Sequence, residues 1–351
     1  MARSWGAPLF AALVAGAWAS ACSSDDAREP LLPVAGGGLD AGVDDGDDEG
    51  SAAPQSSAGC NAQGAPTYAA GTQMGELEHD GLARSFRVHV PPGYRADRPA
   101  ALVVMLHGGG GSGRQFELNS ARMDAVADRE SFLSVYPDGT GAIKTWNGGG
   151  CCGSAVSEDV DDVGFVAALL DHLEQTLCID RQRIFAAGMS NGGIMSHRLA
   201  CELSDRIAAI APVSGTNMTA SCVPKRPLAV LQIHGTADGH VPYDGGEGCG
   251  PAGVAFPSVP ATMEAWRLRN GCSSAKTVTF QQGDGSCETY GGCVFGADVT
   301  LCSITGGGHS WPGGDPPAGL VECPANGPQS TTFSASEVIW SFFRQHPLST
   351  K

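Results

Sequence analysis

A single serine stands between two glycines in the stretch Gly-Met-Ser-Asn-Gly at residues 188–192, where an apolar run ends and a helical pattern begins. A side chain at the apex of such a strand-to-helix turn points out of the fold, and glycines two residues to either side avoid clashes there. The pattern is typical of a nucleophile elbow and predicts that Ser190 is a nucleophile. A turn serine without chemistry is the alternative, because a chain with 50 glycines also produces this pattern by chance.

An acid and a histidine follow Ser190 in a suitable order. A serine hydroxyl becomes an effective nucleophile when an imidazole removes its proton and a carboxylate orients that imidazole. Asp238 follows the apolar run 228–234, and His309 follows the run 299–304 in a glycine-rich loop. Because the carboxyl ends of parallel strands meet at one edge of a sheet, we predict that Ser190, Asp238 and His309 form a catalytic triad.

Other residues compete for these roles. Asp244 is a rival acid, and Asp238 could simply be a turn aspartate after a strand. His309 could be a loop histidine that packs on a neighbouring tryptophan. We expect His234, at the end of a strand, to be a packing residue and His240 to shape the loop after Asp238.

The oxygen of a reacting carbonyl becomes negatively charged and needs preorganised donors. One predicted donor is the main-chain N–H of Asn191, directly after the nucleophile. The second is expected from the loop LHGGGGSG at residues 106–113, where glycines let the backbone approach closely, and we predict Gly109. A phosphate-binding loop is the alternative, but the stretch lacks G-K-[ST] and dinucleotide spacing.

Regular elements must position these residues. Six apolar runs resemble strands buried on both faces of a parallel sheet: 101–107, 132–137, 183–188, 207–213, 228–234 and 299–304. Helical patterns lie between several of them: 114–130, 163–177, 192–203 and 258–270. This alternation predicts an α/β fold with a doubly wound, mostly parallel sheet and helices on both faces. An antiparallel hairpin turning at Asp80-Gly81 should precede it.

Three smaller expectations concern the surroundings of the site. Trp146 and Trp311 flank glycine-rich loops and are predicted aromatic walls for a substrate, with plain packing as the alternative. Asp161 and Asp162 lie where a helix begins and are expected to cap it and support the site. The last helix should begin with a capping box formed by Ser334 and Glu337.

The amino terminus carries export signals. Residues 1–21 combine Arg3, an apolar stretch too short to span a bilayer and a small-residue cleavage site, which predicts a signal peptide. Cys22 follows at once, as in a bacterial lipobox, so we expect a lipidated protein at the cell surface, with plain secretion as the alternative. Residues 22–60 contain nine acids and one base and predict a disordered linker, which leaves 61–351 as one catalytic domain.

Charge and cysteine content restrict the partners. A net charge of −16 argues against nucleic acid and anionic surfaces as partners. Apart from Cys22, the chain has an even number of cysteines, which in an exported protein predicts disulfides. For Cys151 and Cys152 we favour separate partners over a bridge between neighbours. No metal or cofactor pattern is found, and a monomer is expected.

Seven blocks occur in an order that resembles polyhydroxybutyrate depolymerase-like esterases, a group related to feruloyl and acetylxylan esterases: HGGGGSG, WNGGGCCG, VDDVGF, GMSNGGIMSHRLACE, HGTADGHVPYDGG, SVPATMEAWRLRNGC and GGGHSWPGG. The resemblance runs from about residue 75 to 346. It implies an α/β-hydrolase fold, a triad of Ser190, Asp238 and His309, ester substrates and no cofactor. Many members of that group carry another residue at the position of Gly109, which is a departure.

The resulting hypothesis is an exported serine carboxylic-ester hydrolase that forms an acyl-enzyme. The expected substrates are feruloyl or acetyl esters of plant polysaccharide, or hydroxyalkanoate oligomers. A true extracellular polyhydroxybutyrate depolymerase is the first alternative, although we expect no separate polymer-binding domain. A peptidase on the same fold and a non-catalytic surface lipoprotein that binds a ligand are the others.

Overall fold

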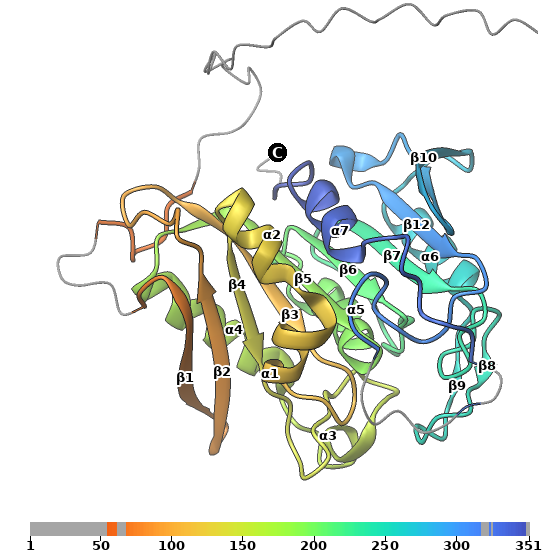
Figure 1. The fold of residues 1–351 in the computed structure, drawn as a ribbon, viewed down its shortest axis with the longest axis horizontal. Coiled ribbons are helices and arrows are strands. Elements are labelled where there is room, and N and C mark those ends of the chain that lie inside the picture. The colour runs from red at the N-terminus through yellow and green to blue at the C-terminus, as the bar shows by residue number, and fades with distance from the viewer. Residues whose placement is uncertain (1–54, 62–67, 317–322, 324–325, 349–351) are drawn as a thin grey trace, which may run out of the picture. The chain divides into compact units, whose positions relative to one another are not determined.

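A mixed ten-stranded sheet is the central layer of this computed structural model, which describes residues 55–61, 68–316, 323 and 326–348 (Figure 1). The strand order is β1-β2-β4-β3-β5-β6-β7-β12-β11-β10. The strands are β1 (Gly71–His79), β2 (Leu82–Val90), β3 (Ala100–Leu106), β4 (Leu133–Pro137), β5 (Ile179–Met189), β6 (Ala209–Val213), β7 (Ala229–Gly235), β10 (Lys276–Gln282), β11 (Gly285–Tyr290) and β12 (Val299–Ile304). A separate pair, β8 (Gly246–Glu247) and β9 (Ala255–Phe256), lies outside this sheet.

The centre of the sheet is parallel and its two edges are antiparallel. Strands β4, β3, β5, β6, β7 and β12 pair in parallel, and each overlaps one of the six apolar runs. At one edge β1 and β2 form the expected hairpin, in which Asp80 (φ 50°) and Gly81 (φ 71°) make the turn. The predicted α/β class and leading hairpin are therefore confirmed. The second hairpin, β10 with β11 at the opposite edge, was not predicted.

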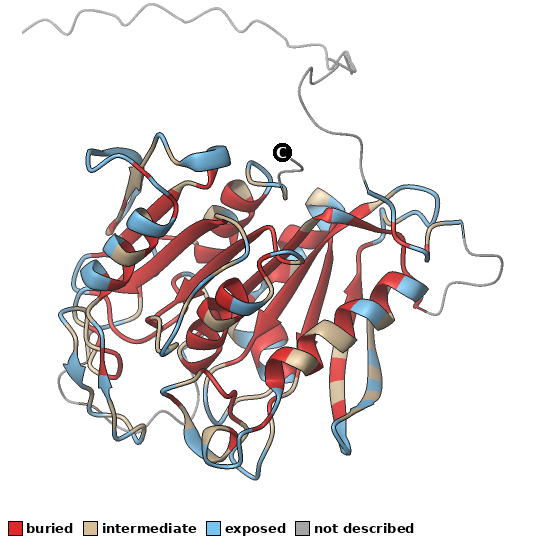
Figure 2. Cartoon of the chain, turned by 180° about the vertical axis from the view of Figure 1, so that it is seen from behind, coloured by how far each residue is buried: buried red, intermediate tan, exposed pale blue. Residues whose placement is uncertain are grey.

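Helices cover both faces of the sheet. They are α1 (Gly113–Gln115), the π-helix η1 (Phe116–Ala121), α2 (Met123–Glu130), α3 (Gly153–Ser157), α4 (Asp162–Thr176), α5 (Asn191–Glu202), α6 (Val259–Arg269), the 3₁₀ turn η2 (Val294–Gly296) and α7 (Ala335–Phe343). Alternate β3 side chains belong to two different cores. One core contains Leu102, Val104 and Leu106 together with side chains of α4, α5 and α6. The other contains Ala101, Val103 and Met105 together with side chains of η1, α2 and α7. The central strands of the sheet are therefore buried on both sides, as Figure 2 shows.

Two helix boundaries differ from expectation because side chains find partners elsewhere in the fold. The pattern at 114–130 breaks into α1, η1 and α2, with Arg122 left-handed at φ 49°. Glu117 within this segment is buried and pairs with Arg87 of β2. At α7 the Ser334 side chain makes no capping bond, and the Glu337 carboxylate instead binds the Arg129 guanidinium at 2.7 Å. The predicted capping box is wrong.

Six disulfides join the twelve cysteines after Cys22: Cys60–Cys178, Cys151–Cys152, Cys201–Cys222, Cys249–Cys323, Cys272–Cys293 and Cys287–Cys302. This confirms the expectation of disulfides but corrects the pairing of Cys151 and Cys152, which bond to each other. The reason lies in the tertiary surroundings of Cys151: it is buried in a small cluster with Ile194, Val241 and Phe256, and the cluster contains no other described cysteine except Cys152.

The packed domain begins earlier than residue 61. Ser57 Oγ donates to Leu177 O at 2.7 Å and accepts from Ile179 N at 2.9 Å, and Cys60 bonds to Cys178. The last residues of the predicted 22–60 linker therefore belong to the fold, because they pair with the start of β5. The predicted signal peptide and Cys22 lie outside the described residues. Within the described residues no helix is long and apolar enough to cross a bilayer.

Candidate active site

Ser190 occupies the sharp turn between β5 and α5. Its backbone is held at φ 56° and ψ −121°, a conformation that non-glycine residues rarely adopt, and its N–H donates to Val213 O at 2.8 Å. The flanking glycines are required by close approach. A Cβ on Gly188 would lie 2.4 Å from Gly192 O, and one on Gly192 would lie 2.1 Å from Leu106 O. The local sequence thus forms the predicted elbow.

Asp238 and His309 meet at the carboxyl ends of β7 and β12. His309 Nδ1 lies 2.8 Å from Asp238 Oδ2, and both side chains are almost completely buried. Asp238 Oδ1 also accepts the main-chain N–H groups of His240 and Val241, each at 2.9 Å. Because Nδ1 faces the carboxylate, His309 Nε2 is the ring atom available to a reacting group. The rival acid Asp244 is exposed and makes no contact of this kind with His309 in the described structure.

The carboxylate of Asp238 is kept ionised by its partners. Burial alone would raise its pKa, but the charge of His309 and hydrogen bonds from His234 and His309 outweigh burial and hold the pKa of Asp238 below its ordinary range. A negative charge beside His309 Nδ1 stabilises the imidazolium that forms when this ring takes a proton from a nucleophile. This is the arrangement that general-base catalysis by histidine requires.

Ser190 and His309 face common space. Both line a cavity with Gly108–Gly111, and both line a second cavity with Asn191. No hydrogen bond joins Ser190 Oγ to His309 among the residues the structure describes, and such bonds are often long before a substrate binds. The three predicted catalytic residues are therefore brought to one site, with the base and acid already paired.

The two predicted oxyanion donors lie on adjacent segments. A Cβ built on Gly109 would be 3.8 Å from Asn191 Cβ, and Asn191 is the first residue of α5, where main-chain N–H groups lack helical partners. Within the described chain the Gly109 N–H donates to no protein group. Gly108 also lies close to the nucleophile, because a Cβ built on it would be 3.4 Å from Ser190 Cβ. The roles of Asn191 and Gly109 stay predictions.

His107 fixes the glycine loop and was missed in the sequence. Its Nε2 accepts from Gly139 N at 2.9 Å and its Nδ1 donates to Gly108 O at 2.8 Å. Burial lowers the pKa of His107 to about 4, so the ring is neutral at ordinary pH and can do both. The signal available was its place at the head of the glycine run, where a strand ends.

Trp146 and Trp311 do not form the walls of the site. Their side chains are 0% and 1% exposed, and neither lines the two cavities at Ser190. The Trp146 main chain exchanges two hydrogen bonds with the Asn191 side chain, at 2.7 and 2.9 Å. The Trp311 indole donates to Ser336 Oγ at 3.1 Å. Both tryptophans therefore pack beneath the loops and stabilise them. The prediction that they contact the substrate is wrong.

The two acids at the start of α4 act as supports, as expected, but in different ways. Asp161 Oδ1 caps the helix by accepting from Gly164 N at 2.9 Å. Asp162 is fully buried, pairs with Arg84 Nη2 at 2.6 Å, and accepts from Asn147 N at 2.7 Å. Asp162 thus ties α4 and β2 to the loop that carries Trp146.

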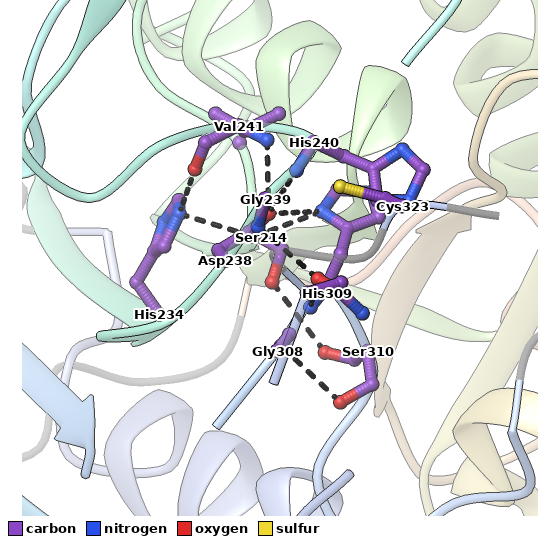
Figure 3. Close-up of polar contacts among 12 residues, drawn as sticks. Ser214, His234, Asp238, Gly239, His240, Val241, Gly308, His309, Ser310 and Cys323 are labelled. Carbon is purple, nitrogen blue, oxygen red and sulfur yellow. Dashed lines mark hydrogen bonds and ion pairs between the residues drawn. The ribbon is translucent and has the colours of Figure 1, made fainter. Parts of the chain in front are cut away.

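A buried chain of hydrogen bonds ends beside Asp238, on the side of this carboxylate that faces away from His309. The members are Trp266, His197, Gln232 and His234, with successive contacts of 3.0, 3.1 and 3.0 Å. His234 Nδ1 accepts from Gln232, so Nε2 carries the proton, and it lies 2.8 Å from Val241 O and 3.3 Å from Asp238 Oδ2. Figure 3 shows His234 and His309 on opposite sides of Asp238. His234 is a positioning residue as well as the packing residue expected.

Replacing His234 with phenylalanine is therefore expected to lower kcat/KM by about 10–100-fold, because a hydrogen bond to a charged group contributes about 1.5–3 kcal/mol. The loss should fall on kcat with KM little changed. Replacing His234 with glutamine, which keeps a donor, should restore part of the rate. Steady-state kinetics with melting temperatures for both variants test this, and full activity in the phenylalanine variant would show that the ring only fills space.

Two clusters of described residues group metal-binding side chains: His240 with Cys249 and Cys323, and His89 with Glu117 and Asp124. Neither fits a metal as it stands. The two cysteines of the first cluster are bonded to each other. In the second, Arg87 pairs with Glu117 and the Tyr136 hydroxyl donates to Asp124 at 2.6 Å.

Comparisons with known proteins agree with this geometry. Residues 84–239 match the family model described as Esterase PHB depolymerase. Feruloyl esterase B of Piromyces equi is 33% identical over 236 residues, which are 65% of this chain and 42% of that protein. The putative esterase NocK of Nocardia uniformis subsp. tsuyamanensis is 33% identical over 275 residues, 71% of this chain and 76% of that protein. The chain thus spans less than half of the first relative and most of the second.

Two further similarities extend the picture. The probable feruloyl esterase C of Aspergillus terreus is 30% identical over 253 residues, 68% of this chain and 85% of that protein. Among solved structures, acetyl xylan esterase from Aspergillus awamori superposes with a TM-score of 0.52 at 14% identity, over 68% of this chain and 94% of that chain. At that identity the superposition demonstrates a shared fold.

Proposed function

This chain belongs to the Esterase PHB depolymerase family of α/β-hydrolase esterases, and on that premise we propose that it is a serine carboxylic-ester hydrolase using Ser190, His309 and Asp238. The observation that carries the proposal is the buried Asp238–His309 pair, in which Asp238 Oδ2 lies 2.8 Å from His309 Nδ1. His309 lines the same cavity as Ser190, the serine on the glycine-flanked turn. A ligand-binding module would need none of this arrangement.

The reaction begins when Ser190 Oγ attacks the ester carbonyl while His309 Nε2 takes its proton. Asp238 stabilises the resulting imidazolium, and the N–H groups of Asn191 and Gly109 stabilise the negative oxygen. His309 then gives the proton to the departing alcohol and leaves an acyl group on Ser190. Water activated by His309 releases the acid and restores the serine.

Feruloyl or acetyl esters of plant-type polysaccharide are the proposed substrates, supported by the names of several relatives. Short hydroxybutyrate oligomers should be accepted, and crystalline polyhydroxybutyrate poorly. The six disulfides support export to an oxidising compartment. A signal peptide at 1–21, a lipid anchor on Cys22 with release as the alternative, an acidic linker after Cys22 and a monomeric catalytic domain complete the proposal.

The purified protein is expected to hydrolyse p-nitrophenyl acetate, methyl ferulate and acetylated xylan well, hydroxybutyrate trimer measurably and polymer film slowly. Each rate is compared with that of the Ser190→Ala variant. An ester activity no greater than that of the variant would contradict the enzyme proposal. Clearing of the film without release of ferulate or acetate would favour the depolymerase alternative, and faster cleavage of a matched anilide would favour a peptidase.

A further inference from the structure

Two cavities of different chemistry meet at Ser190. One has a volume of about 420 Å³ and the other about 590 Å³, and Ser190, Gly109 and His309 line both. We call the first the glycine chamber, because Gly108–Gly111 form one side of it, and the second the apolar chamber. The nucleophile therefore stands at the junction of two spaces rather than at the bottom of one.

The apolar chamber has a wall built from its own hydrophobic cluster. Ile194, Val241 and Phe256 are buried beside the bonded pair Cys151–Cys152, apart from the two main cores. Cys152 and the remaining apolar side chains extend this wall along the cavity: Ala142, Ile143, Pro251 and Ala252. Glu158 is the one acidic or basic side chain, histidines aside, among the described residues that line it. Such a surface favours an apolar group over a sugar.

The glycine chamber offers hydrogen-bonding groups instead. Beyond the main chain of Gly108–Gly111, it is lined by four polar side chains, Ser112, Gln115, Asn119 and Ser120, together with the apolar Phe116, Met189 and Pro316. Hydroxyl and amide groups of this kind can both donate to and accept from a polyhydroxylated molecule. The two chambers thus differ in the group that each can bind.

When Ser190 attacks, the former carbonyl carbon is bonded to Ser190 Oγ, the oxyanion, the hydrocarbon substituent of the acid and the alkoxy group. The acid and alcohol portions of the ester must therefore extend from Ser190 in different directions. Asn191, the predicted oxyanion donor after the nucleophile, lines the apolar chamber and not the other. Resting on the proposed function, we propose that the apolar chamber binds the acyl group and the glycine chamber binds the alcohol. The substrate class is then an ester between an apolar aryl or alkyl acid and a sugar-like alcohol.

This assignment distinguishes between two candidate classes of substrate, polyesters of hydroxyacids and acylated polysaccharides. In a polyester of hydroxyacids, the units on either side of the reacting bond are chemically alike. In a feruloylated or acetylated polysaccharide, one side is an acyl group and the other is a sugar. Two unlike chambers fit the second case better, because a polyester would place the same unit against an apolar wall and a polar one.

Two filling substitutions test the assignment. Ala252→Phe narrows the apolar chamber and Asn119→Phe narrows the glycine chamber, and neither side chain belongs to the proposed triad or a main core. The acyl ratio compares kcat/KM for p-nitrophenyl ferulate with that for p-nitrophenyl acetate. The alcohol ratio compares a feruloylated arabinose oligosaccharide with methyl ferulate. Ala252→Phe should lower the acyl ratio at least 10-fold, and Asn119→Phe should lower the alcohol ratio by a similar factor.

Ile143→Ser provides a second probe of the apolar wall, because Ile143 is 72% exposed and its replacement should leave folding intact. It should lower the acyl ratio and not the alcohol ratio. If Ala252→Phe and Ile143→Ser change the alcohol ratio instead, or if no variant changes either ratio, the assignment is overturned while ester hydrolysis stands. A wild-type protein no more active than Ser190→Ala would instead overturn the proposed function itself.

Discussion

Replacing His309 with alanine is expected to lower kcat/KM for p-nitrophenyl acetate by about 10⁴-fold or more, whereas replacing His240 should lower it by less than about 10-fold. The two histidines form a matched pair, since both line the apolar chamber and their ring centroids are 4.9 Å apart. The two histidines differ in how they contact Asp238. His309 Nδ1 contacts the Asp238 carboxylate at 2.8 Å, whereas His240 reaches Asp238 through its main-chain N–H.

The electrostatics of the two rings support the same distinction. The pKa of His240 is lowered, first by burial and then by the charge of His309, so protonating His240 during a reaction would be unfavourable. The ionised Asp238 stabilises the positive charge that His309 carries after it takes the Ser190 proton. A general base must be unprotonated to accept that proton, so the wild type should be less active at pH 5 than at pH 8.

Steady-state kinetics of both alanine variants across that pH range would decide the point, with circular dichroism to show that each is folded. Equal losses in the two variants would mean that His309 is not a specific base. A wild-type rate that is the same at pH 5 and pH 8 would also contradict the mechanism. The alanine at 240 retains the main-chain donor to Asp238, so the comparison removes one ring at a time.

Much of the site could be predicted because its signals are local in sequence. The Ser190 turn depends on glycines two residues away, and Asp238 and His309 follow apolar runs that end at the same edge of the sheet. Chain order then suggests which acid and which histidine to choose. The sheet could be predicted for the same reason, since strands buried on both faces show as uninterrupted apolar runs.

What could not be predicted depends on contacts between distant segments. Trp146 stands beside a glycine loop in the sequence, but its indole turns inward to donate to His107 O at 3.0 Å. The position of Trp146 in the sequence indicates that an aromatic residue lies near the site, but it does not indicate in which direction the side chain points. The Cys151–Cys152 bond and the buried Glu117 that accompanies the break at 114–130 have the same origin. Each depends on which side chains arrive from elsewhere, so tertiary contacts override local preference.

Replacing Asp162 with alanine should destabilise the folded protein by about 3–5 kcal/mol, because it leaves the Arg84 guanidinium charged and buried without its carboxylate. The Asp162 side chain is completely buried, and the Arg84 side chain is 2% exposed. Arg84 Cζ also lies 3.8 Å from the centroid of the Phe165 ring, so a side chain of α4 covers the guanidinium. Losing the acceptor for Asn147 N adds to the cost. Urea unfolding with disulfides intact would measure the change.

The adjacent acid provides the control, because Asp161 is exposed and its cap contributes only about 1 kcal/mol. Asp161→Ala should therefore be mildly destabilised. A double variant, Arg84→Met with Asp162→Leu, should recover part of the loss, since most of the cost of the single variant comes from the charge left unpaired rather than from the attraction lost. If Asp162→Ala were no less stable than Asp161→Ala, the buried pair could not be what holds the Trp146 loop against α4. A further loss in the double variant would mean that the Asn147 bond, and not the ion pair, is the larger contribution.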